Sequence, residues 1–275
     1  MVYWKWEDVA ALFGQGRRQK QVGCVYPLTD HGQQPMKMHT EVTLLYKYIH
    51  IYCLEGCIIS FLGVPSVAFD YSFKDLNVTT YPVYHSVHDT FNWVEKFVDP
   101  NFLIHLSMCK LTARLLLRLT DSNVLPMDVT QYSASLLQSI DKLNTSSLNT
   151  SPDPISVDHI RQAILDFNKT THEFEKKKEK FSSMDVSRIR IVNNQMANLE
   201  KIFINPYGLP NRPDIRNIVF APAITNLYGS SSFPGISDQL SEKPIKWKEV
   251  KKQMNILYKS IKEANQFLQP LEDEK

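Results

Sequence analysis

Residues that could do chemistry cluster in the stretch YPVYHSVHDTFNWVEKFVDP, residues 81–100. Tyr84 and His85 form a pair, and His88 and Asp89 follow about one helical turn later. Imidazole nitrogens and carboxylate oxygens are common zinc ligands. The residue types leave two interpretations open: a metal-binding cluster, or the start of an ordinary exposed helix.

Other metal donors are sparse along the chain. Asp30 and His31 are adjacent and Glu41 lies ten residues further on, yet an improvised site from these three is disfavoured. Two cysteines are four residues apart, but no second pair follows at zinc-finger spacing. Four cysteines are too few for a disulfide scaffold, so we expect buried free thiols at Cys24, Cys53, Cys57 and Cys109.

The composition is that of a globular protein. The chain has 275 residues, 43% hydrophobic and 22% charged, which is enough for one large domain or two small ones. A net charge of +2 without a clustered basic face argues against nucleic acid as a partner. The lysines at 176–178 lie in an alternating run of glutamate and lysine, which is typical of a solvated helix face.

The N-terminal third contains one long apolar run but no signal-peptide pattern. Residues 49–69 are long enough in principle to cross a bilayer. Because this run contains Glu55, Gly56, Gly63 and Pro65, it favours two strands, in GCIISFLG and PSVAFDYSF, joined by a turn. A membrane span remains the alternative.

From residue 99 onward, apolar residues recur every three or four positions, which predicts helices. Asp99 before Pro100 is a typical helix start. The wide apolar face that follows consists of Leu103, Leu106, Cys109, Leu111, Ala113, Leu116, Leu117 and Leu119. Such stripes are typical of the core of a helical bundle. The further elements predicted are helices at 129–143, around 160–174, at 186–203 and at 247–268, with a polar linker at 144–154 and an irregular segment at 218–240.

Four motifs, in this order, resemble the C-terminal part of the glutamate carboxypeptidase II family: YPVYHSVHDTFNWVEKFVDPNF, LTDSNVLPMD, NNQMANLEKIFINPYGLPNRP and FAPAITNLYGSSSFPGI. These N-acetylated-alpha-linked acidic dipeptidases are M28 zinc peptidases related to transferrin receptor. The resemblance runs from about Phe61 to Leu268. It implies a mainly α fold, in which a C-terminal helical dimerisation bundle packs on a remnant of an α/β zinc-peptidase domain. The implied domains are an unrecognised segment at 1–55, the peptidase remnant at 56–98 and the dimerisation domain at 99–275.

The resemblance also implies roles for the residues of the first motif. Family members bind two zinc ions through two histidines, two aspartates and a glutamate, with a further glutamate as the general base. The histidine of their Tyr-His pair is the last ligand and maps onto His85. The neighbouring Tyr84 would then donate a hydrogen bond to the tetrahedral intermediate. On this basis His88 and Asp89 are expected at an exposed helix start.

Most of the implied zinc site is missing from this chain. In the family, the other four ligands and the general base lie further upstream than the 84 residues that precede His85 here. Those residues contain no His-x-Asp pattern and no Glu-Glu pair. A catalytic zinc ion needs about three protein ligands and an open position. We therefore expect this chain to bind no zinc stably and to be inactive alone.

The implied substrate pocket has changed as well. Acidic-dipeptide members grip glutamate with basic residues, and the matching positions here are Ala68, Asp70 and Leu227. Tyr228 matches a family tyrosine that contacts the substrate carboxylate. An uncharged pocket with one aspartate disfavours glutamate, so a complete parent would release C-terminal residues from a broader range of peptides.

The helical region implies partners, and the family implies a location. Its resemblance to a dimerisation domain implies a homodimer, or a dimer with a full-length relative. Family members are type II membrane glycoproteins, and N-glycosylation motifs in this chain would permit an extracellular or lumenal location. The candidate acceptors are Asn77, Asn144, Asn149 and Asn168.

Three functional hypotheses remain open at this point. The first is the C-terminal part of a zinc carboxypeptidase, catalytically incomplete by itself. The second is a non-catalytic dimerisation or interaction module of the transferrin receptor-like superfamily. The third is an active metallopeptidase whose other ligands are unrecognised, for which His85 would be essential.

Overall fold

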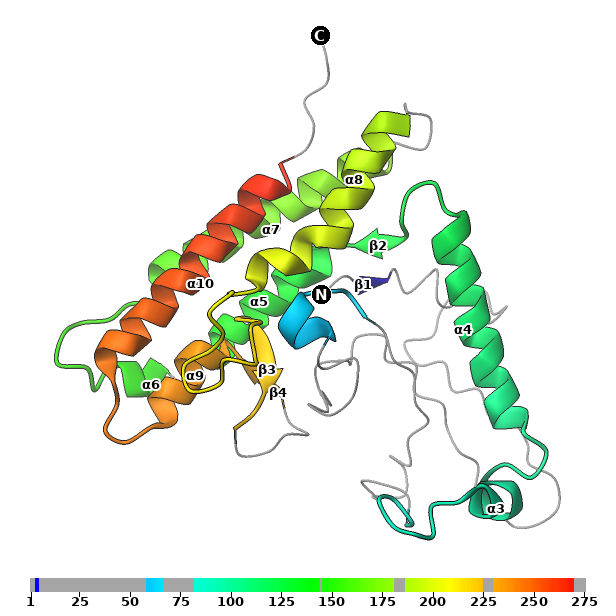
Figure 1. Cartoon of the computed structure of the whole chain (residues 1–275). Helices are drawn as coiled ribbons and strands as arrows, with labels where there is room; N and C mark the ends of the chain where they lie inside the picture. The colour runs from blue at the N-terminus through cyan, green and yellow to red at the C-terminus, as the bar shows by residue number, and fades with distance from the viewer. Residues whose placement is uncertain are drawn as a thin grey trace. The chain divides into compact units, whose positions relative to one another are not determined.

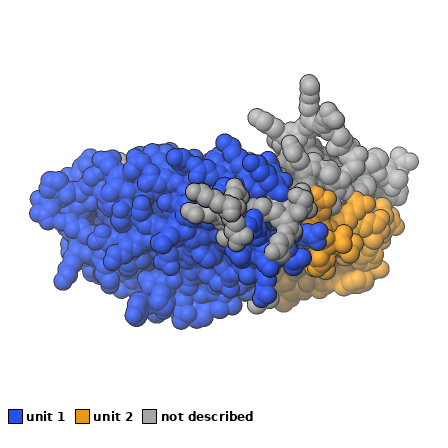
Figure 2. All heavy atoms as spheres, turned by 90° about the horizontal axis from the view of Figure 1, so that it is seen from above, with its two compact units in different colours: residues 1–4, 43–67, 123–275 blue, residues 5–42, 68–122 orange. Residues whose placement is uncertain are grey.

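The computed structural model describes residues 3–4, 58–66, 82–143, 145–180, 186–224 and 230–269. The chain divides into two compact units (Figure 2). The bundle unit comprises residues 1–4, 43–67 and 123–275, and the small unit comprises residues 5–42 and 68–122. The division thus falls after Ser122, whereas the domain boundary predicted before residue 99 stays a prediction.

The described part of the small unit is a turn followed by helices. α3 (Phe91–Trp93) runs directly into the π-helical turn η3 (Val94–Val98), and α4 (Leu103–Asp121) follows. Thr90 caps α3, because its hydroxyl accepts a hydrogen bond from the backbone N–H of Trp93 at 3.4 Å. The helix predicted after residue 100 is present as α4, but it begins at Leu103 with Phe102 at its N-cap, so the start predicted at Asp99 and Pro100 is wrong.

α4 buries only one of its two apolar sides. Leu111 and Leu115, one turn apart, are its buried residues. Much of the predicted apolar face is instead exposed, at Leu103, Leu106, Cys109, Leu116 and Leu117. The expectation of a buried thiol at Cys109 is thus wrong, and the other cysteines lie outside the described residues. Because α4 is apolar almost all round, its sequence pattern does not say which side is covered.

The bundle unit is built mainly from long helices (Figure 1). They are α5 (Thr130–Lys142), α7 (Asp158–Lys178), α8 (Val186–Asn198) with its 3-10 continuation η5 (Leu199–Phe203), and α10 (Trp247–Phe267). α7 packs against both α5 and α10, and η5 packs against α10. The predicted helices and the mainly α fold class are therefore confirmed.

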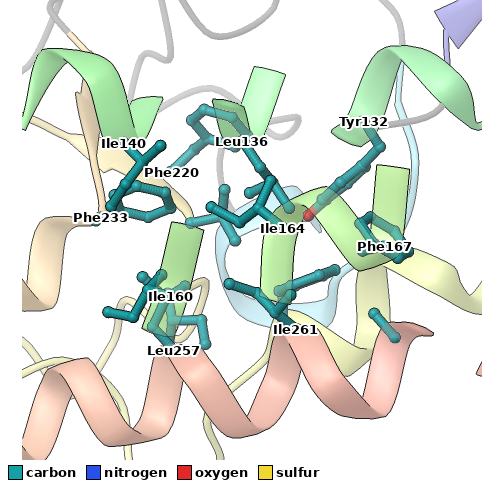
Figure 3. Close-up of a cluster of buried hydrophobic side chains, with 14 of the residues drawn as sticks. Tyr132, Leu136, Ile140, Ile160, Ile164, Phe167, Phe220, Phe233, Leu257 and Ile261 are labelled. Carbon is teal, nitrogen blue, oxygen red and sulfur yellow. The ribbon is translucent and has the colours of Figure 1, made fainter. Parts of the chain in front are cut away.

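The apolar stripes of these helices meet in one core (Figure 3). The ring of Tyr132 on α5 stacks on Phe203 with 5.0 Å between the ring centroids, and it meets the edge of Phe167 on α7. The stripe predicted for α8 is buried only in its second half, since Val186 is 79% exposed. The predicted stripe residues that lie in the core are Ile160, Ile164, Phe167, Phe174, Val192, Met196, Leu199, Phe203, Val250, Met254, Leu257, Ile261, Ala264 and Leu268.

Short strands and helices connect the long ones. β1 (Tyr3–Trp4) pairs antiparallel with β2 (Met127–Asp128), and β3 (Phe220–Pro222) pairs antiparallel with β4 (Ser230–Ser232). α9 (Pro234–Ser241) begins with proline at its first position, where no backbone N–H is needed. The segment predicted to be irregular thus contains a hairpin and a helix. One helical turn, α6 (Thr145–Leu148), interrupts the predicted polar linker.

The strand predicted at 56–63 is wrong where the structure describes it. Residues 58–62 form a π-helical turn, η1 (Ile58–Leu62), which ends at Gly63 with φ of 63°. A Cβ at this glycine would lie 2.6 Å from a side-chain carbon of Ile204, so only glycine fits there. The carbonyl of Ser60 accepts hydrogen bonds from the backbone N–H groups of Arg216 and Asn217, which replace a strand ladder. A short apolar run does not by itself distinguish these outcomes.

Among the described residues, no helix has both the length and the apolar character that a bilayer span requires. Most of the apolar run at 49–69 and of the strand predicted at 65–73, together with the short helix at 6–13, lies outside them.

Candidate functional site

Tyr84 and His85 lie in a tight turn that precedes α3. Their rings stack with 3.9 Å between centroids and an interplanar angle of 18°. His85 has φ of 58°, in the left-handed region that few non-glycine residues adopt. Ser86 braces the turn, because both its backbone N–H and its hydroxyl donate to the carbonyl of Val83, at 3.0 and 2.7 Å. The turn therefore presents an exposed imidazole beside a half-buried phenol.

His88 and Asp89 belong to the approach to α3. Both are exposed, and the backbone N–H groups of these two residues bond to the hydroxyl and carbonyl of Ser86, at 3.2 Å each. Thr90 then caps the helix. This geometry agrees with the expectation of an exposed helix start and places neither residue in a cluster with His85.

The described residues do not assemble a two-zinc site of the kind that the resemblance attributes to the family. Across these ranges, no group of three or more histidine, cysteine, aspartate or glutamate side chains comes together in a way that could hold a metal ion. A catalytic zinc ion takes about three protein ligands. His85 alone does not fit that requirement, so its role as a ligand, like that of Tyr84 as an oxyanion donor, stays a prediction.

A carboxylate whose burial the sequence pattern did not predict directly follows η3 in the chain. Asp99 is 2% exposed, and its Oδ2 accepts a hydrogen bond from the backbone N–H of His105 at 2.9 Å and lies 2.7 Å from Nδ1 of that ring. Burial alone would raise the pKa of Asp99, but the hydrogen bonds from His105 and from the backbone N–H of Ile104 outweigh it and lower the pKa. Asp99 is the residue that ends η3, and its side chain holds the imidazole of His105 on the first turn of α4.

The predicted substrate-contact positions Leu227, Tyr228, Ala68 and Asp70 all lie outside the described residues. Leu227 and Tyr228 fall between β3 and β4 in the sequence, and the described hairpin ends where Pro222 pairs with Ser230. The hydroxyl of Ser139 on α5 donates to the hydroxyl of Ser232 at 3.1 Å and ties the hairpin to the bundle. These four assignments stay predictions.

Arg212 anchors the base of this hairpin. Its Nη1 donates to the carbonyl of Pro222, and its Nη2 donates to Oδ2 of Asp238 on α9, each at 2.6 Å. Burial raises the pKa of Asp238, although Arg212 opposes that shift. Sequence reasoning missed this pair, because nothing in the spacing of an arginine in a loop and an aspartate on a helix marks them as neighbours.

A second polar anchor holds the start of β3. The side chain of Asn217 is fully buried; its Nδ2 donates to Oε1 of Glu200 at 2.7 Å. Its Oδ1 accepts hydrogen bonds from the backbone N–H groups of Val219 and Phe220 at 2.9 and 3.1 Å. Because Asn217 and Glu200 are both buried, these hydrogen bonds hold the backbone at the start of β3 in place.

Two of the candidate glycosylation sites can be placed. Asn149 is exposed in the turn after α6. Asn168 is half-buried on α7, where its amide oxygen accepts a hydrogen bond from the hydroxyl of Ser133 at 2.8 Å, and Thr170 of the same motif is 6% exposed. Asn77 and Asn144 lie outside the described residues. Glycosylation stays a prediction, for which Asn149 is the better placed acceptor.

The outer surface of the bundle unit is mixed in character. Large apolar side chains are exposed on its helices at Val186, Ile191, Leu165 and Phe267. The outward side of α10 is instead basic, with exposed lysines at Lys248, Lys252, Lys259 and Lys262. Because like charges repel across an interface, a self-complementary contact is not expected to centre on that side of α10.

Comparison with known proteins places this chain in a family. Residues 155–269, which include α7 to α10, match the transferrin receptor-like dimerisation domain. Aminopeptidase NAALADL1 of Rattus norvegicus is 31% identical over 231 residues, covering 78% of this chain and 30% of the relative. Probable glutamate carboxypeptidase LAMP1 of Arabidopsis thaliana is 30% identical over 212 residues, covering 75% of this chain and 30% of the relative.

A third relative agrees with these two. Probable glutamate carboxypeptidase VP8 of Zea mays is 31% identical over 185 residues, covering 65% of this chain and 24% of the relative. The chain thus spans 30% or less of the length of each of these three relatives. It belongs through its C-terminal region to the peptidase family of the glutamate carboxypeptidases and the N-acetylated-alpha-linked acidic dipeptidase-like proteins, and residues 155–269 are its transferrin receptor-like dimerisation domain.

Proposed function

We propose that this chain is the C-terminal part of a glutamate carboxypeptidase-like zinc peptidase, that it is catalytically incomplete by itself, and that it acts through its dimerisation bundle. One observation carries the proposal. The helices of the bundle unit enclose one hydrophobic core, whereas the predicted metal ligand His85 stands on an exposed turn, and no group of three or more metal donors comes together among the described residues.

The bundle supports dimerisation in particular. An isologous dimer buries the same patch on both copies, and exposed apolar side chains such as Leu165 on α7 and Ile191 on α8 suit such a patch. The exposed lysines along α10 are better suited to contact with solvent than to an interface between two copies. The partner is a second copy of this chain or the matching bundle of a full-length relative.

Metal analysis and sedimentation of the full chain test this proposal together. After dialysis against trace zinc, we expect well under two zinc ions per chain. We also expect a concentration-dependent monomer–dimer equilibrium that a chelator leaves unchanged. His85→Ala should sediment like the parent chain, and His88→Ala in the same turn is the matched control.

The opposite results would be equally informative. About two zinc ions per chain, with peptide hydrolysis that His85→Ala abolishes and His88→Ala keeps, would establish the third hypothesis, an active metallopeptidase. A chain that stays monomeric at high micromolar concentration would remove dimerisation from the proposal.

A non-catalytic interaction module is the second candidate function. It is favoured by the bundle unit's own hydrophobic core, which apolar side chains fill. The two functions differ in what the dimer does: a module that docks on a full-length relative should form mixed dimers with it and change its activity. Co-expression of the two chains, followed by size-exclusion chromatography of tagged complexes, distinguishes them.

The substrate range of a complete parent is part of the proposal. Ala68, Asp70 and Leu227 would leave a pocket without the basic groups that hold a glutamate side chain. A full-length protein with these residues should cleave neutral C-terminal residues at least as well as glutamate. Basic residues restored at the three positions should shift the preference toward glutamate, measured as the ratio of kcat/KM values.

A further inference from the structure

Four exposed lysines share the outward side of α10, the last helix of the bundle unit (Figure 1). They are Lys248, Lys252, Lys259 and Lys262. With 3.6 residues per turn, this spacing keeps all four within about 80° of one direction around the helix axis. The core residues of the same helix, such as Val250, Leu257 and Ile261, lie on the opposite side. The four side chains, called the lysine stripe below, therefore lie on the side of α10 that is turned away from the core.

The lysine stripe is uniform in character. The other exposed positions on this side of the helix are Asn255 and Gln266, so it contains neither an acidic nor an apolar residue. From Lys248 to Lys262 it extends about 21 Å, at about 1.5 Å per residue. Within the described residues, Lys252 is the one of the four with an ion-pair partner, Glu249 at 3.5 Å. The outward ridge of α10 thus carries a row of positive charge that the described part of the chain hardly neutralises.

A shallow hollow of about 450 Å³ adjoins the C-terminal half of the lysine stripe. Lys259 and Lys262 line it together with the amide side chains of Gln266 and Gln269, and Glu263 is the one acidic residue of its lining. Ammonium and amide N–H groups donate hydrogen bonds, and those from an ammonium group to an anion are the stronger ones. The hollow therefore suits a small anionic group at one end of the row of charges.

We propose that the lysine stripe docks the bundle unit on an anionic lipid surface, with one lipid headgroup in the hollow beside Lys259 and Lys262. A convex ridge on a continuous helix can meet a flat surface along its whole length. Anionic bilayers attract lysines near their surface, and a cluster of four or more on one helix is a typical pattern for binding acidic lipids. Because the apolar side of α10 is buried in the core, the helix stays on the surface and does not insert.

Other anionic partners fit the lysine stripe less well. A single-stranded nucleic acid binds through aromatic rings on which its bases stack, and the exposed positions on this side of α10 include no aromatic residue. A helical peptide docks through apolar anchors, which this side also lacks. Lysine is a point charge, whereas specific recognition of single phosphates or carboxylates favours the planar fork of arginine. The residue types therefore favour a continuous anionic surface.

Cosedimentation of the full chain with vesicles tests the proposal. The surface does not depend on the proposed function, because it lies on the side of α10 where the dimer contact is not expected. Vesicles of phosphatidylcholine with phosphatidylserine should bind the chain, and vesicles of phosphatidylcholine alone should not. Raising the salt from ~0.1 M to ~1 M should release the chain, because the Debye length falls from about 10 Å to about 3 Å.

Two pairs of substitutions locate the binding surface. Lys259→Gln/Lys262→Gln should weaken binding to the anionic vesicles about 25-fold, since each lysine near such a surface contributes about five-fold. Lys248→Gln/Lys252→Gln should weaken it by less, because Glu249 already pairs with Lys252. All four side chains are exposed, so thermal unfolding of both variants should match that of the parent chain.

A matched control removes the same charge elsewhere. Lys169 on α7 and Lys201 on η5 are exposed lysines outside the lysine stripe. Lys169→Gln/Lys201→Gln should therefore bind the anionic vesicles nearly as tightly as the parent chain.

Three results would overturn the proposal. Equal losses in the control and in Lys259→Gln/Lys262→Gln would mean that net charge alone drives the binding. Equal binding to neutral and anionic vesicles would remove the lysines from it. Duplex DNA that binds the chain through Lys259 and Lys262, while anionic vesicles do not bind, would assign the lysine stripe to a soluble polyanion.

Discussion

Glu175 and Lys178 lie one turn apart on α7 and form an ion pair in the interior of the bundle unit, with 2.5 Å between Oε2 and Nζ. The other carboxylate oxygen of Glu175 accepts a hydrogen bond from the backbone N–H of Val129 at 3.1 Å, and Nζ of Lys178 donates to the carbonyl of Met127. Both side chains are at least nine-tenths buried. The pair therefore ties α7 to the chain that enters α5.

Glu175 should make the stability of the bundle depend on pH. Burial raises its pKa above the ordinary value of 4.5, although Lys178 and the N–H of Val129 oppose the shift. Between 4.5 and the raised value, the folded chain holds a proton that the unfolded chain has lost, so the stability contribution of Glu175 falls as the pH rises through this window. Urea unfolding from acidic to neutral pH should show this slope in the wild type and lose it in Glu175→Gln. Glu173→Gln, an exposed neighbour on α7, is the control, and parallel curves for wild type and Glu175→Gln would contradict the prediction.

The two partners of the pair should depend on each other. Lys178→Met leaves a buried carboxylate without its cation, which should cost about 3–5 kcal/mol of unfolding free energy at neutral pH. The double variant Glu175→Leu/Lys178→Met should lose much less, because it removes both buried charges and keeps the volume. A double-mutant cycle from urea unfolding measures the coupling. Additive losses would mean that the two side chains act separately.

Arg212 should control the order of the β3–β4 hairpin. Arg212→Lys keeps one charge but cannot bond Pro222 and Asp238 together, so Asp238 is left partly unpaired in a buried position. We expect a loss of about 3 kcal/mol and faster amide hydrogen exchange at residues 220–221 and 230–232. Arg190→Lys, an exposed arginine on α8, is the matched control and should change neither. Unchanged exchange in Arg212→Lys would show that the hairpin is held by Asn217 and the strand pairing.

The helical phase of α7 gives a simple test of the bundle. Phe167 is 0% exposed in the core, whereas Leu165 on the same helix is 45% exposed. Phe167→Ala should cost about 3–5 kcal/mol through the cavity it creates, and Leu165→Ala should cost well under that in the monomer. Thermal unfolding at low protein concentration compares the two. Similar losses for both variants would mean that α7 is rotated relative to the structure.

Periodicity predicted most of the bundle because its helices are amphipathic over many turns. The residues of α7 and α10 that recur every three or four positions are those that fill the core, from Ile160 to Phe174 and from Val250 to Leu268. Such a pattern is repeated often enough to outweigh single exceptions like Val186. The pair Tyr84–His85 was also found from sequence alone, as residue types and as a family motif.

Features that depend on contacts between residues distant in sequence were determined only by the tertiary structure. Residues 58–62 are apolar enough for a strand, yet contacts with Ile204 and Arg216 select a helical turn. α4 has two apolar sides, and only packing determined that Leu111 is buried while Cys109 is exposed.

The buried polar pairs follow the same rule. The carboxylates of Asp238 and Asp99 are buried, and each is tolerated there because the fold supplies a hydrogen-bonding partner, Arg212 or His105. The helices and the family could be predicted from the sequence alone, because the spacing of apolar residues indicates the helices and short motifs indicate the family. Three-dimensional packing decided which charges are buried and that the thiol of Cys109 is exposed, because desolvation and pairing are properties of the folded environment.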